Sequence, residues 1–430
     1  MGFIKKMTPG RFIALGFALV ILLGALLLYL PITHRENVDV AFMDALFTST
    51  SAVCVTGLIA VDTYDTYNVF GQIVVALLIQ VGGLGVTSVG VGFMLLARRK
   101  VDFKDRILVK EALNLDSLKG VVKLVKSVLL MTLCFEGIGA LLSFVVFSQD
   151  YSLPRAIGTS LFHAVASFNN AGFDNLGGLK NLLDYKSNVL LNLTTCGLII
   201  FGGLGFVVIK EIIHKHSFKK FSLHSKVVIA MTLFLLTAGT VTLKLSEDIS
   251  WLGAFFFSTS ARTAGFSTYP VGAFTNVGLF ILIILMFIGA SPGSTGGGIK
   301  TTTTFTLFMR AYSASTNKHC GAFKRKLPVE IITKAFLIAF LAMVWVCFST
   351  MLVCIFEPGY TFIQLLFEVV SAFGTVGLST GITPDLKPIS EFVIIIAMFI
   401  GRVGPLTIAS LWSVKPKTGV SYSEEAITIG

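Results

Sequence analysis

The stretch FTSTSAVCVTGL, at residues 47–58, recurs in outline three more times along the chain. The other copies are FHAVASFNNAGF at 162–173, FFFSTSARTAGF at 255–266 and FEVVSAFGTVGL at 367–378. Each copy begins with phenylalanine, continues through small and hydroxyl-bearing residues, and ends with glycine followed by a large apolar residue. Four copies of one motif predict four similar units around one axis, and the space on that axis would be a pore.

The composition is that of an integral membrane protein. Of the 430 residues, 54% are hydrophobic and only 13% are charged, whereas about 25% charged residues is usual in soluble domains. Stretches of about 20 apolar residues, long enough to cross a bilayer, lie at 11–30, 70–97, 127–147, 187–209, 227–245, 277–308, 335–356 and 391–412. Each motif falls between the two members of a successive pair. The sequence therefore predicts an all-α membrane fold with pseudo-fourfold symmetry, built from eight transmembrane helices and four re-entrant pore helices around a central pore.

The pairing of spans divides the chain into four pore repeats. We place them at 11–97, 127–210, 227–310 and 335–412, and a run of glycine, serine and threonine breaks the second helix of the third repeat. The glycine clusters at 81–85 and 201–205, in the second helices of the first two repeats, are interpreted as helix-packing sites, because small residues allow close approach. All four motifs enter from the same side, which makes the repeats parallel rather than inverted.

The basic residues indicate the orientation in the membrane. Lysine and arginine cluster at 5–11, 98–126, 210–226, 310–334 and 415–417. Because basic loops favour the cytoplasmic side, we expect a multi-pass plasma-membrane protein, surrounded by lipid, with both termini in the cytoplasm. The net charge of +11 then reflects topology, and no nucleic-acid partner is implied. The six cysteines show neither a CxxC pair nor metal-site spacing.

The four motifs have the features expected of an ion-selectivity filter. Non-helical backbone is tolerated at membrane depth where it lines a wet cavity, and glycine permits backbone angles that other residues avoid. Backbone carbonyls in such a segment can replace the water around a potassium ion, and no organic cofactor is expected. The predicted filter comprises Cys54, Val55, Thr56 and Gly57; Asn169, Asn170, Ala171 and Gly172; Arg262, Thr263, Ala264 and Gly265; and Gly374, Thr375, Val376 and Gly377.

A flexible loop at 289–304 is the candidate gate, because a transmembrane helix broken in the bilayer usually lines a functional cavity. The residues assigned to it are Gly289, Ser291, Pro292, Gly293, Ser294, Thr295, Gly296, Gly297, Gly298 and Lys300. Arg402 joins this set because a charge in the middle of a span is costly and by default marks function. We expect Arg402 to repel cations and to hold the loop through its carbonyls, and Lys300 to pair with an acid or a partner.

At these residues the chain resembles the Trk/Ktr/HKT superfamily of potassium transporters, and within it the bacterial KtrB-type membrane subunits. The resemblance covers nearly the whole chain and rests on the four pore units, the glycine in each filter, the broken helix of the third unit and the arginine of the fourth. It implies filter glycines at Gly57, Gly172, Gly265 and Gly377, a gating loop at 289–304 and a gate arginine at Arg402. Some sodium-preferring plant relatives replace the first filter glycine by serine, so Gly57 favours potassium.

The resemblance also implies partners. It predicts a potassium-uptake subunit that forms a homodimer with one pore in each protomer, gated by a cytoplasmic KtrA-type ring of nucleotide-binding RCK domains. The sequence shows no phosphate-binding motif of its own, so nucleotide control would come from another chain. The basic loops 98–126, 210–226 and 310–334 are the expected docking surface.

Other functions are less consistent with the sequence. A secondary transporter that couples a solute or potassium to sodium or protons also uses broken helices, but such folds usually show inverted repeats. An enzyme is not expected, since the sequence shows no HExxH, no GxSxG and no paired carboxylates in the spans. The choice between a channel and a coupled symporter stays open at this stage.

Overall fold

Helices form most of the molecule. The computed structural model describes residues 8–96, 101–112 and 120–410. The α-helices are α1 (Pro9–Tyr29), α2 (Phe42–Val53), α3 (Thr63–Thr66), α4 (Val69–Leu84), α5 (Val86–Leu96), α6 (Phe103–Ala112), α7 (Val121–Asp150), α8 (Leu153–Phe168), α9 (Val189–Leu204), α10 (Phe206–Lys215), α11 (Leu223–Ser246), α12 (Trp251–Ser260), α13 (Asn276–Phe287), α14 (Thr301–Thr316), α15 (Val329–Phe356), α16 (Phe362–Gly374), α17 (Pro388–Val403) and α18 (Pro405–Ser410). Short 3₁₀ turns occur at Pro31–Thr33, Leu183–Tyr185, Phe218–Lys220, Val271–Ala273 and Thr383–Asp385, and a small hairpin pairs β1 (Gly321–Ala322) with β2 (Arg325–Lys326).

Four helices are long and apolar enough to cross a membrane unaided: α1, α7, α11 and α15. Each precedes a shorter pore helix, which is α2, α8, α12 or α16 respectively. The pairs α4–α5 and α9–α10 each pass the same test as one bent unit, which raises the number of candidate spans to six within the described residues. The all-α membrane fold expected from the sequence is confirmed, and the protein is a multi-pass membrane protein.

The second helices are broken more often than the sequence predicted. Spans 70–97 and 187–209 were expected to be continuous, but they bend by 98° and 99° at Gly85 and Gly205. Gly85, Gly205 and Gly404 all have positive φ angles, of 83°, 92° and 97°, which glycine adopts without the steric cost that a side chain brings. The span expected at 391–412 therefore also divides at Gly404 into α17 and α18. In the third repeat, residues 288–300 separate α13 from α14. The loop predicted at 289–304 is therefore shorter at its end, because Thr301–Thr304 already belong to α14.

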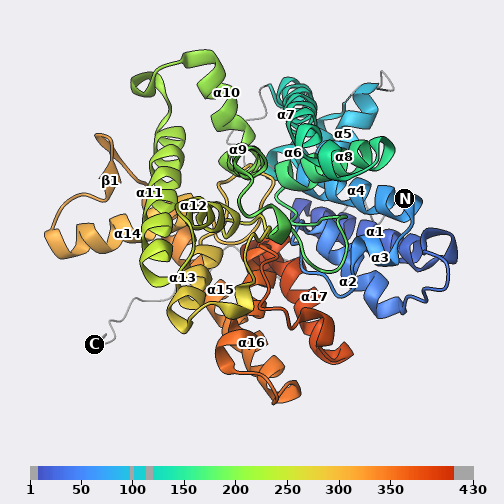
Figure 1. Cartoon of the computed structure of the whole chain (residues 1–430). Helices are drawn as coiled ribbons and strands as arrows, with labels where there is room; N and C mark the ends of the chain where they lie inside the picture. The colour runs from blue at the N-terminus through green and yellow to red at the C-terminus, as the bar shows by residue number, and fades with distance from the viewer. Residues whose placement is uncertain (1–7, 97–100, 113–119, 411–430) are drawn as a thin grey trace.

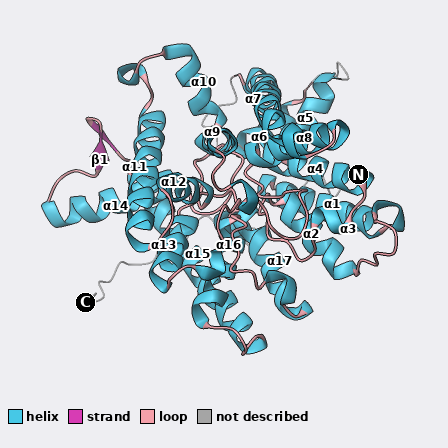
Figure 2. Cartoon of the chain, in the orientation of Figure 1, coloured by secondary structure: helices cyan, strands magenta, loops and turns pink. Residues whose placement is uncertain are grey.

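The four repeats form a closed ring. The second helix of each repeat contacts the pore helix of the next: α4 contacts α8, α9 contacts α12, α13 contacts α16, and α17 contacts α2. Figure 1 shows the four groups of helices surrounding a common centre. Figure 2 shows that loops rather than helices gather at this centre. The chain segments that carry the repeated motif are therefore brought together by helix packing around them.

Glycines let the second helices press against the ends of the pore helices. A Cβ atom on Gly82, Gly202 or Gly401 would collide with the carbonyl oxygen of Val53, Phe168 or Phe373, respectively. Each of these carbonyls belongs to the fourth residue before a motif glycine. The clusters at 81–85 and 201–205, which we interpreted as helix-packing sites, do serve packing here, and both also end their helices. The cluster at 400–404 does the same.

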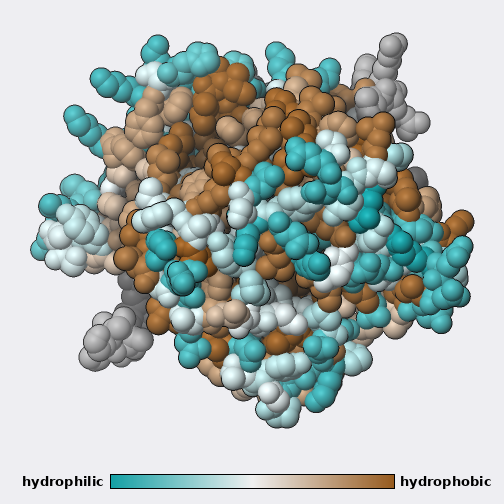
Figure 3. Space-filling view, in the orientation of Figure 1, coloured by the Kyte–Doolittle hydropathy of each residue, from teal (hydrophilic) through white to brown (hydrophobic). Residues whose placement is uncertain are grey.

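Apolar side chains are distributed as a membrane requires. The second halves of the pore helices are buried, and Phe47 and Phe367 at the start of their motifs are fully buried. Phe255 is half-buried, and its neighbours Phe256 and Phe257 fill the core instead. In contrast, leucines of α1 and α7 and phenylalanines of α15 are exposed on the outside. Figure 3 shows broad apolar areas on the visible face, as expected for a surface in contact with lipid tails.

The glycine contacts give a prediction about stability. Gly202→Ala should lower the thermal stability of the detergent-purified protein, because the new methyl group would meet the carbonyl oxygen of Phe168 and overpacking costs about 1–3 kcal/mol. Gly197→Ala on the same helix is the matched control, because a Cβ there has no atom within 4 Å. The control should be neutral or stabilising, since alanine favours helix over glycine. Equal melting temperatures for the two variants would contradict the proposed contact.

Candidate functional site

The four motif glycines lie in one ring. A Cβ atom on Gly57 would lie 3.0 Å from the Cα of Gly172, one on Gly172 3.0 Å from Gly265, one on Gly265 3.0 Å from Gly377, and one on Gly377 2.9 Å from Gly57. Each glycine therefore touches the next repeat, and the last touches the first. Only residues without a side chain can pack this closely around an axis.

The backbone of the four segments repeats as well. The residue two before each glycine has a left-handed conformation: φ is 50° at Val55, 58° at Asn170, 78° at Thr263 and 51° at Thr375. The glycines themselves have φ between 66° and 95°. Valine and threonine rarely adopt positive φ, and such strain persists only where surrounding structure imposes it and is typical of functional sites. Sequence inspection found the glycines but gave no sign of this second position.

Hydrogen bonds explain how the segments hold this shape. In three repeats the residue before the glycine donates its N–H to a carbonyl five residues earlier, at 2.8 Å from Thr56 to Ser51, from Ala171 to Ala166 and from Val376 to Ser371. In the third repeat Ala264 donates to the carbonyl of Ser260, four residues earlier, at 2.9 Å. The hydroxyls of Ser51 and Ser371 also accept the N–H groups of Gly57 and Gly377 at 3.0 Å. The amide donors are thus used by the pore helices behind the segments. The carbonyl oxygens near the glycines are left at the ring, where those of Thr56, Ala171, Ala264 and Val376 each approach the glycine of a neighbouring repeat.

The 288–300 loop packs against one side of this ring. Its Gly297 N–H donates to the hydroxyl of Thr375 at 2.9 Å, and a Cβ on Gly296 would collide with the hydroxyl of Thr263. The hydroxyl of Thr295 donates to the carbonyl of Phe168 at 3.3 Å. The loop therefore contacts the segments of repeats 2, 3 and 4 directly. The sequence-assigned residues Gly289 to Gly298 form one compact loop, within which the hydroxyl of Ser294 donates to the Ser291 carbonyl at 2.6 Å.

Helix breaks supply the partners that hold this loop. The N–H groups of Ser291 and Thr295 donate to the carbonyls of Gly203 and Gly202, at 3.0 Å and 3.2 Å. These carbonyls belong to the last turn of α9, where a helix leaves its final carbonyls without internal partners. The N–H of Phe206, just after the break, donates in return to the carbonyl of Gly293 at 3.0 Å.

Arg402 holds the loop from the opposite side. Its guanidinium donates to the carbonyls of Thr295 in the loop and of Gly82 in α4, and to Gly83 at 3.2 Å. It also lies 5.9 Å from the ring centre of Phe17. The carbonyl contact expected from the sequence is present. The negative end of α4 stabilises the cation there, so an arginine at membrane depth has hydrogen-bond partners rather than an ion-pair partner.

Three other polar residues behave differently from the simplest expectation. Lys300 contacts carbonyls rather than an acid: its ammonium donates to Gly296 and Gly297 at 2.6 Å and 3.3 Å. Arg262 is buried and reaches away toward the Thr232 hydroxyl, at 3.5 Å. The amide of Asn169 donates to Glu136 at 3.0 Å and to Gln80 at 2.9 Å, so Glu136 is a hydrogen-bond partner behind the ring.

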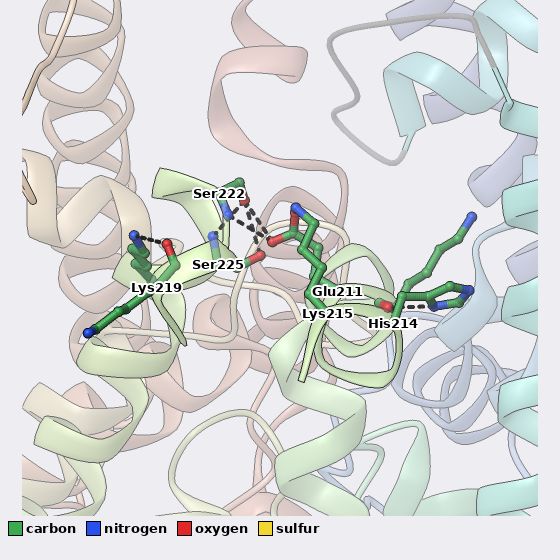
Figure 4. Close-up of polar contacts among 8 residues, drawn as sticks. Glu211, His214, Lys215, Lys219, Ser222 and Ser225 are labelled. Atoms are coloured by element: carbon green, nitrogen blue, oxygen red, sulfur yellow. Dashed lines mark hydrogen bonds and ion pairs between the residues drawn. The ribbon is translucent and has the colours of Figure 1, made fainter. Parts of the chain in front are cut away.

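A short helix connects the loop to the basic surface. α10 begins at Phe206, beside the loop, and Glu211 near its other end accepts hydrogen bonds from the N–H and the hydroxyl of Ser222, both at 3.0 Å. Lys215 forms an ion pair with Glu211 at 2.5 Å, and Figure 4 shows this cluster, with Lys219 on one side of it and His214 on the other. The segment 210–226 is thereby tied to the start of α11 at one end and to the 288–300 loop at the other.

The other side of the ring carries two carboxylates that the filter motifs do not explain. Glu368, fully buried on α16, accepts hydrogen bonds at 2.8 Å from the hydroxyl of Ser379, the N–H of Thr380 and the hydroxyl of Thr383. It therefore fixes the chain just beyond Gly377. On the second repeat, Asp174 accepts the N–H of Leu176 at 3.0 Å. Both residues hold chain segments that leave the ring.

The electrostatics of Asp174 are unusual. Burial raises the pKa of this carboxyl to about 7, while the N–H of Leu176 and the amide of Asn181 oppose the rise and the carboxylates of Asp62 and Asp65 add to it. An acid with a raised pKa is ionised only above that value, so Asp174 gains its negative charge as the pH rises through about 7. It lies two residues beyond the ring glycine Gly172.

The comparisons with known proteins agree with this architecture. The family model described as "TrkH: Cation transport protein" matches residues 17–247 and 221–421. The chain is similar to the potassium/sodium uptake protein NtpJ of Enterococcus hirae, with 39% identity over 99% of this chain and 98% of that protein. It is also similar to the Ktr system potassium uptake protein B of Bacillus subtilis, with 36% identity over 99% of this chain and 97% of that protein.

A solved structure shares the fold. The crystal structure of the potassium transporter TrkH from Vibrio parahaemolyticus matches with a TM-score of 0.76, covering 95% of this chain and 86% of that one at 16% identity. At this identity the match speaks for the fold alone. The resemblance stated from the sequence is confirmed by these comparisons, and the matching family is one of cation transport proteins rather than of enzymes.

The ionisation of Asp174 gives a prediction about pH. We expect cation flux through the reconstituted protein to fall as the pH on the side of Asp174 drops from about 8 to about 6, because protonation removes a negative charge near the ring. Asp174→Asn should flatten this dependence. Asp184→Asn is the control, since Asp184 is an exposed carboxylate of the same loop. An unchanged pH profile in Asp174→Asn would exclude Asp174 as its source.

Proposed function

Because the chain belongs to the TrkH family of cation transport proteins, we propose that it takes up potassium through the ring of Gly57, Gly172, Gly265 and Gly377. The observation that carries this proposal is the closed ring itself, in which each glycine lies against the next repeat. A potassium ion at the ring exchanges its hydration water for backbone carbonyls from four repeats. The filter is formed by residues 54–57, 169–172, 262–265 and 374–377.

Potassium is the proposed cargo for two reasons. A ring of uncharged carbonyls suits a weakly hydrated monovalent cation, whereas calcium prefers carboxylates. Relatives with 34% to 39% identity over nearly the whole chain are named for uptake of potassium, or of potassium and sodium. The left-handed residues Val55, Asn170, Thr263 and Thr375 orient successive carbonyls toward the ion.

The 288–300 loop is proposed as the gate. It lies against the filter through Thr263 and Thr375, where it obstructs the ion path. Arg402 stabilises this closed arrangement by bonding to the carbonyl of Thr295, and its charge repels cations at the same place. Opening requires the loop to leave both Arg402 and the carbonyls of Gly202 and Gly203.

Regulation by a second chain is proposed from the surface next to this gate. Relatives are named as components of a Ktr system, and the resemblance to KtrB-type subunits implies a homodimer controlled by a KtrA-type ring of nucleotide-binding RCK domains. The basic segment 210–226, connected to the loop by α10, is proposed as part of the docking surface. Because basic loops favour the cytoplasmic side, both termini and the basic loops are cytoplasmic in the proposed orientation, and the filter opens to the outside.

A coupled mechanism is the second candidate. One relative at 39% identity is named as a potassium/sodium uptake protein, which favours sodium as a co-transported ion over other couplings. A sodium requirement for potassium uptake in liposomes distinguishes a symporter from a channel, since a channel carries potassium in the absence of sodium.

The filter assignment predicts the effect of Gly57→Ser. In liposomes with the purified protein, the parent should conduct potassium and rubidium in preference to sodium and lithium, and the variant should lose most of this preference. The physical reason is that φ is 89° at Gly57, where a side chain is strained and points at Gly172. Gly158→Ser is the matched control, because a Cβ at this pore-helix glycine meets no atom within 4 Å. Unchanged selectivity in Gly57→Ser would remove this residue from the filter.

The gate assignment predicts that potassium flux rises when the loop is released. Arg402→Ala removes the donors to Thr295 and Gly82, and deletion of 293–298 removes the obstruction itself, so both should raise flux in the absence of any partner. Arg310→Ala, which removes an exposed arginine of α14, should conduct like the parent. Parent-like flux from both gate variants, measured at equal protein incorporation, would refute the gate.

A further inference from the structure

Asn181 lies in the loop that follows the second filter segment, and it contacts two neighbouring repeats. Its amide nitrogen donates to the carbonyl of Gly172 at 3.2 Å and to the carboxylate of Asp174 at 3.1 Å. Its amide oxygen accepts the N–H of Ser267, in the third repeat, at 3.0 Å. The same oxygen accepts the N–H of Leu182 at 3.0 Å. One side-chain amide thus makes four hydrogen bonds, two donated by its nitrogen and two accepted by its oxygen.

The local backbone supports this placement. φ is 52° at Asn181, a left-handed conformation that asparagine adopts more readily than most residues with a side chain. The next residue strengthens the link, because the N–H of Leu182 also donates to the carbonyl of Ser267 at 3.1 Å. Ser267 is two residues beyond Gly265. Asn181 therefore ties the exit of the second filter segment to the exit of the third.

This contact makes the ring unequal. Within the described residues, Gly172 is the filter glycine whose carbonyl accepts a side-chain hydrogen bond, whereas those of Gly57, Gly265 and Gly377 accept none. A carbonyl that is shared with an amide donor has less electron density for an ion and is less free to move inward. Both effects disfavour a small, strongly hydrated cation, which needs close and strongly polar oxygens, more than they disfavour potassium.

We propose that Asn181 is a positioning residue that sets the selectivity of the filter for potassium over sodium by holding the carbonyl of Gly172. The proposal rests on the proposed function of the ring. Asn181 acts through Gly172 rather than as a primary ligand. It lies outside the repeated motif, and the first, third and fourth repeats have no asparagine at the matching place, nine residues after the filter glycine.

The sharpest test exchanges two side chains. The double variant Asp174→Asn, Asn181→Asp keeps one amide and one carboxylate, keeps their mutual hydrogen bond, and keeps acceptors for Leu176, Leu182 and Ser267. It removes the donor to the Gly172 carbonyl and leaves a carboxylate oxygen in its place. In liposomes we expect the preference for potassium over sodium to fall by about 3- to 10-fold, the scale of one neutral hydrogen bond. The KM for sodium should fall more than the KM for potassium, because the freed carbonyl is more polar and can move closer to a small ion. The maximal rate should change less than twofold.

Single variants separate this effect from charge and from folding. Asp174→Asn retains Asn181 and should keep the parental ion preference, even though its pH profile changes. Asn188→Asp is the matched control from the same loop, because Asn188 caps α9 through the N–H of Leu191, a role that aspartate also fills. Asn181→Gly, which tolerates the left-handed backbone, provides the same test if the double variant does not fold.

The outcomes are distinct. Loss of preference in the folded double variant, or in Asn181→Gly where the double variant does not fold, supports the proposal when both controls keep the parental ion preference. Parental preference in the folded double variant, or in Asn181→Gly where the double variant does not fold, overturns it. The same loss in Asn188→Asp also overturns it, because a general effect of the loop would then explain the data. A parent protein without preference for potassium instead contradicts the proposed function, and this is visible before any variant is compared.

Discussion

The centre of the molecule is held together by carbonyl groups that become free where helices end at glycine. The last turn of any α-helix leaves carbonyls without an internal partner, and in a membrane these groups find no water to bind. The break after α9 leaves Gly202 and Gly203 available to the N–H groups of the 288–300 loop. The break after α4 leaves Gly82 and Gly83 available to the guanidinium of Arg402. The equivalent carbonyls of Gly82 and Gly202 thus bind different partners, the guanidinium of Arg402 and the N–H of Thr295. Arg402 also binds the carbonyl of Thr295, so both sets of contacts meet at this residue.

The filter segments also depend on how their backbone hydrogen-bonding groups are paired. Its segments are non-helical, so every N–H needs an acceptor, and the pore helices supply these acceptors through Ser51, Ala166 and Ser371. Once the donors are used behind the segments, the carbonyls are the polar groups left at the axis. Glycine at the narrowest point is then required by space, because the next repeat lies about as close as two backbones can approach.

Sequence reasoning found the ring because repetition is visible without a structure. The motif glycines, the pore helices and the broken third repeat all follow from spacing and composition, and Arg402 stands out as a charge inside an apolar span. The bends at Gly85, Gly205 and Gly404 were missed, because a helix-packing glycine and a helix-ending glycine look alike in a sequence. The left-handed residues at Val55 and Thr375 were missed for a stronger reason. Valine and threonine disfavour that conformation, so only the surrounding structure could reveal it.

Departures from fourfold symmetry are where this architecture acquires specific behaviour. Four identical repeats would produce a filter but no gate, since nothing would distinguish one second helix from another. Here the third repeat supplies the loop, the fourth supplies Arg402, and the first and second supply the carbonyls that receive them. The outer side follows the same pattern, because Glu368 holds the chain beyond Gly377 while Asn181 joins the exits of the second and third segments. A single chain containing four repeats can vary each one independently, which an assembly of four identical subunits cannot do.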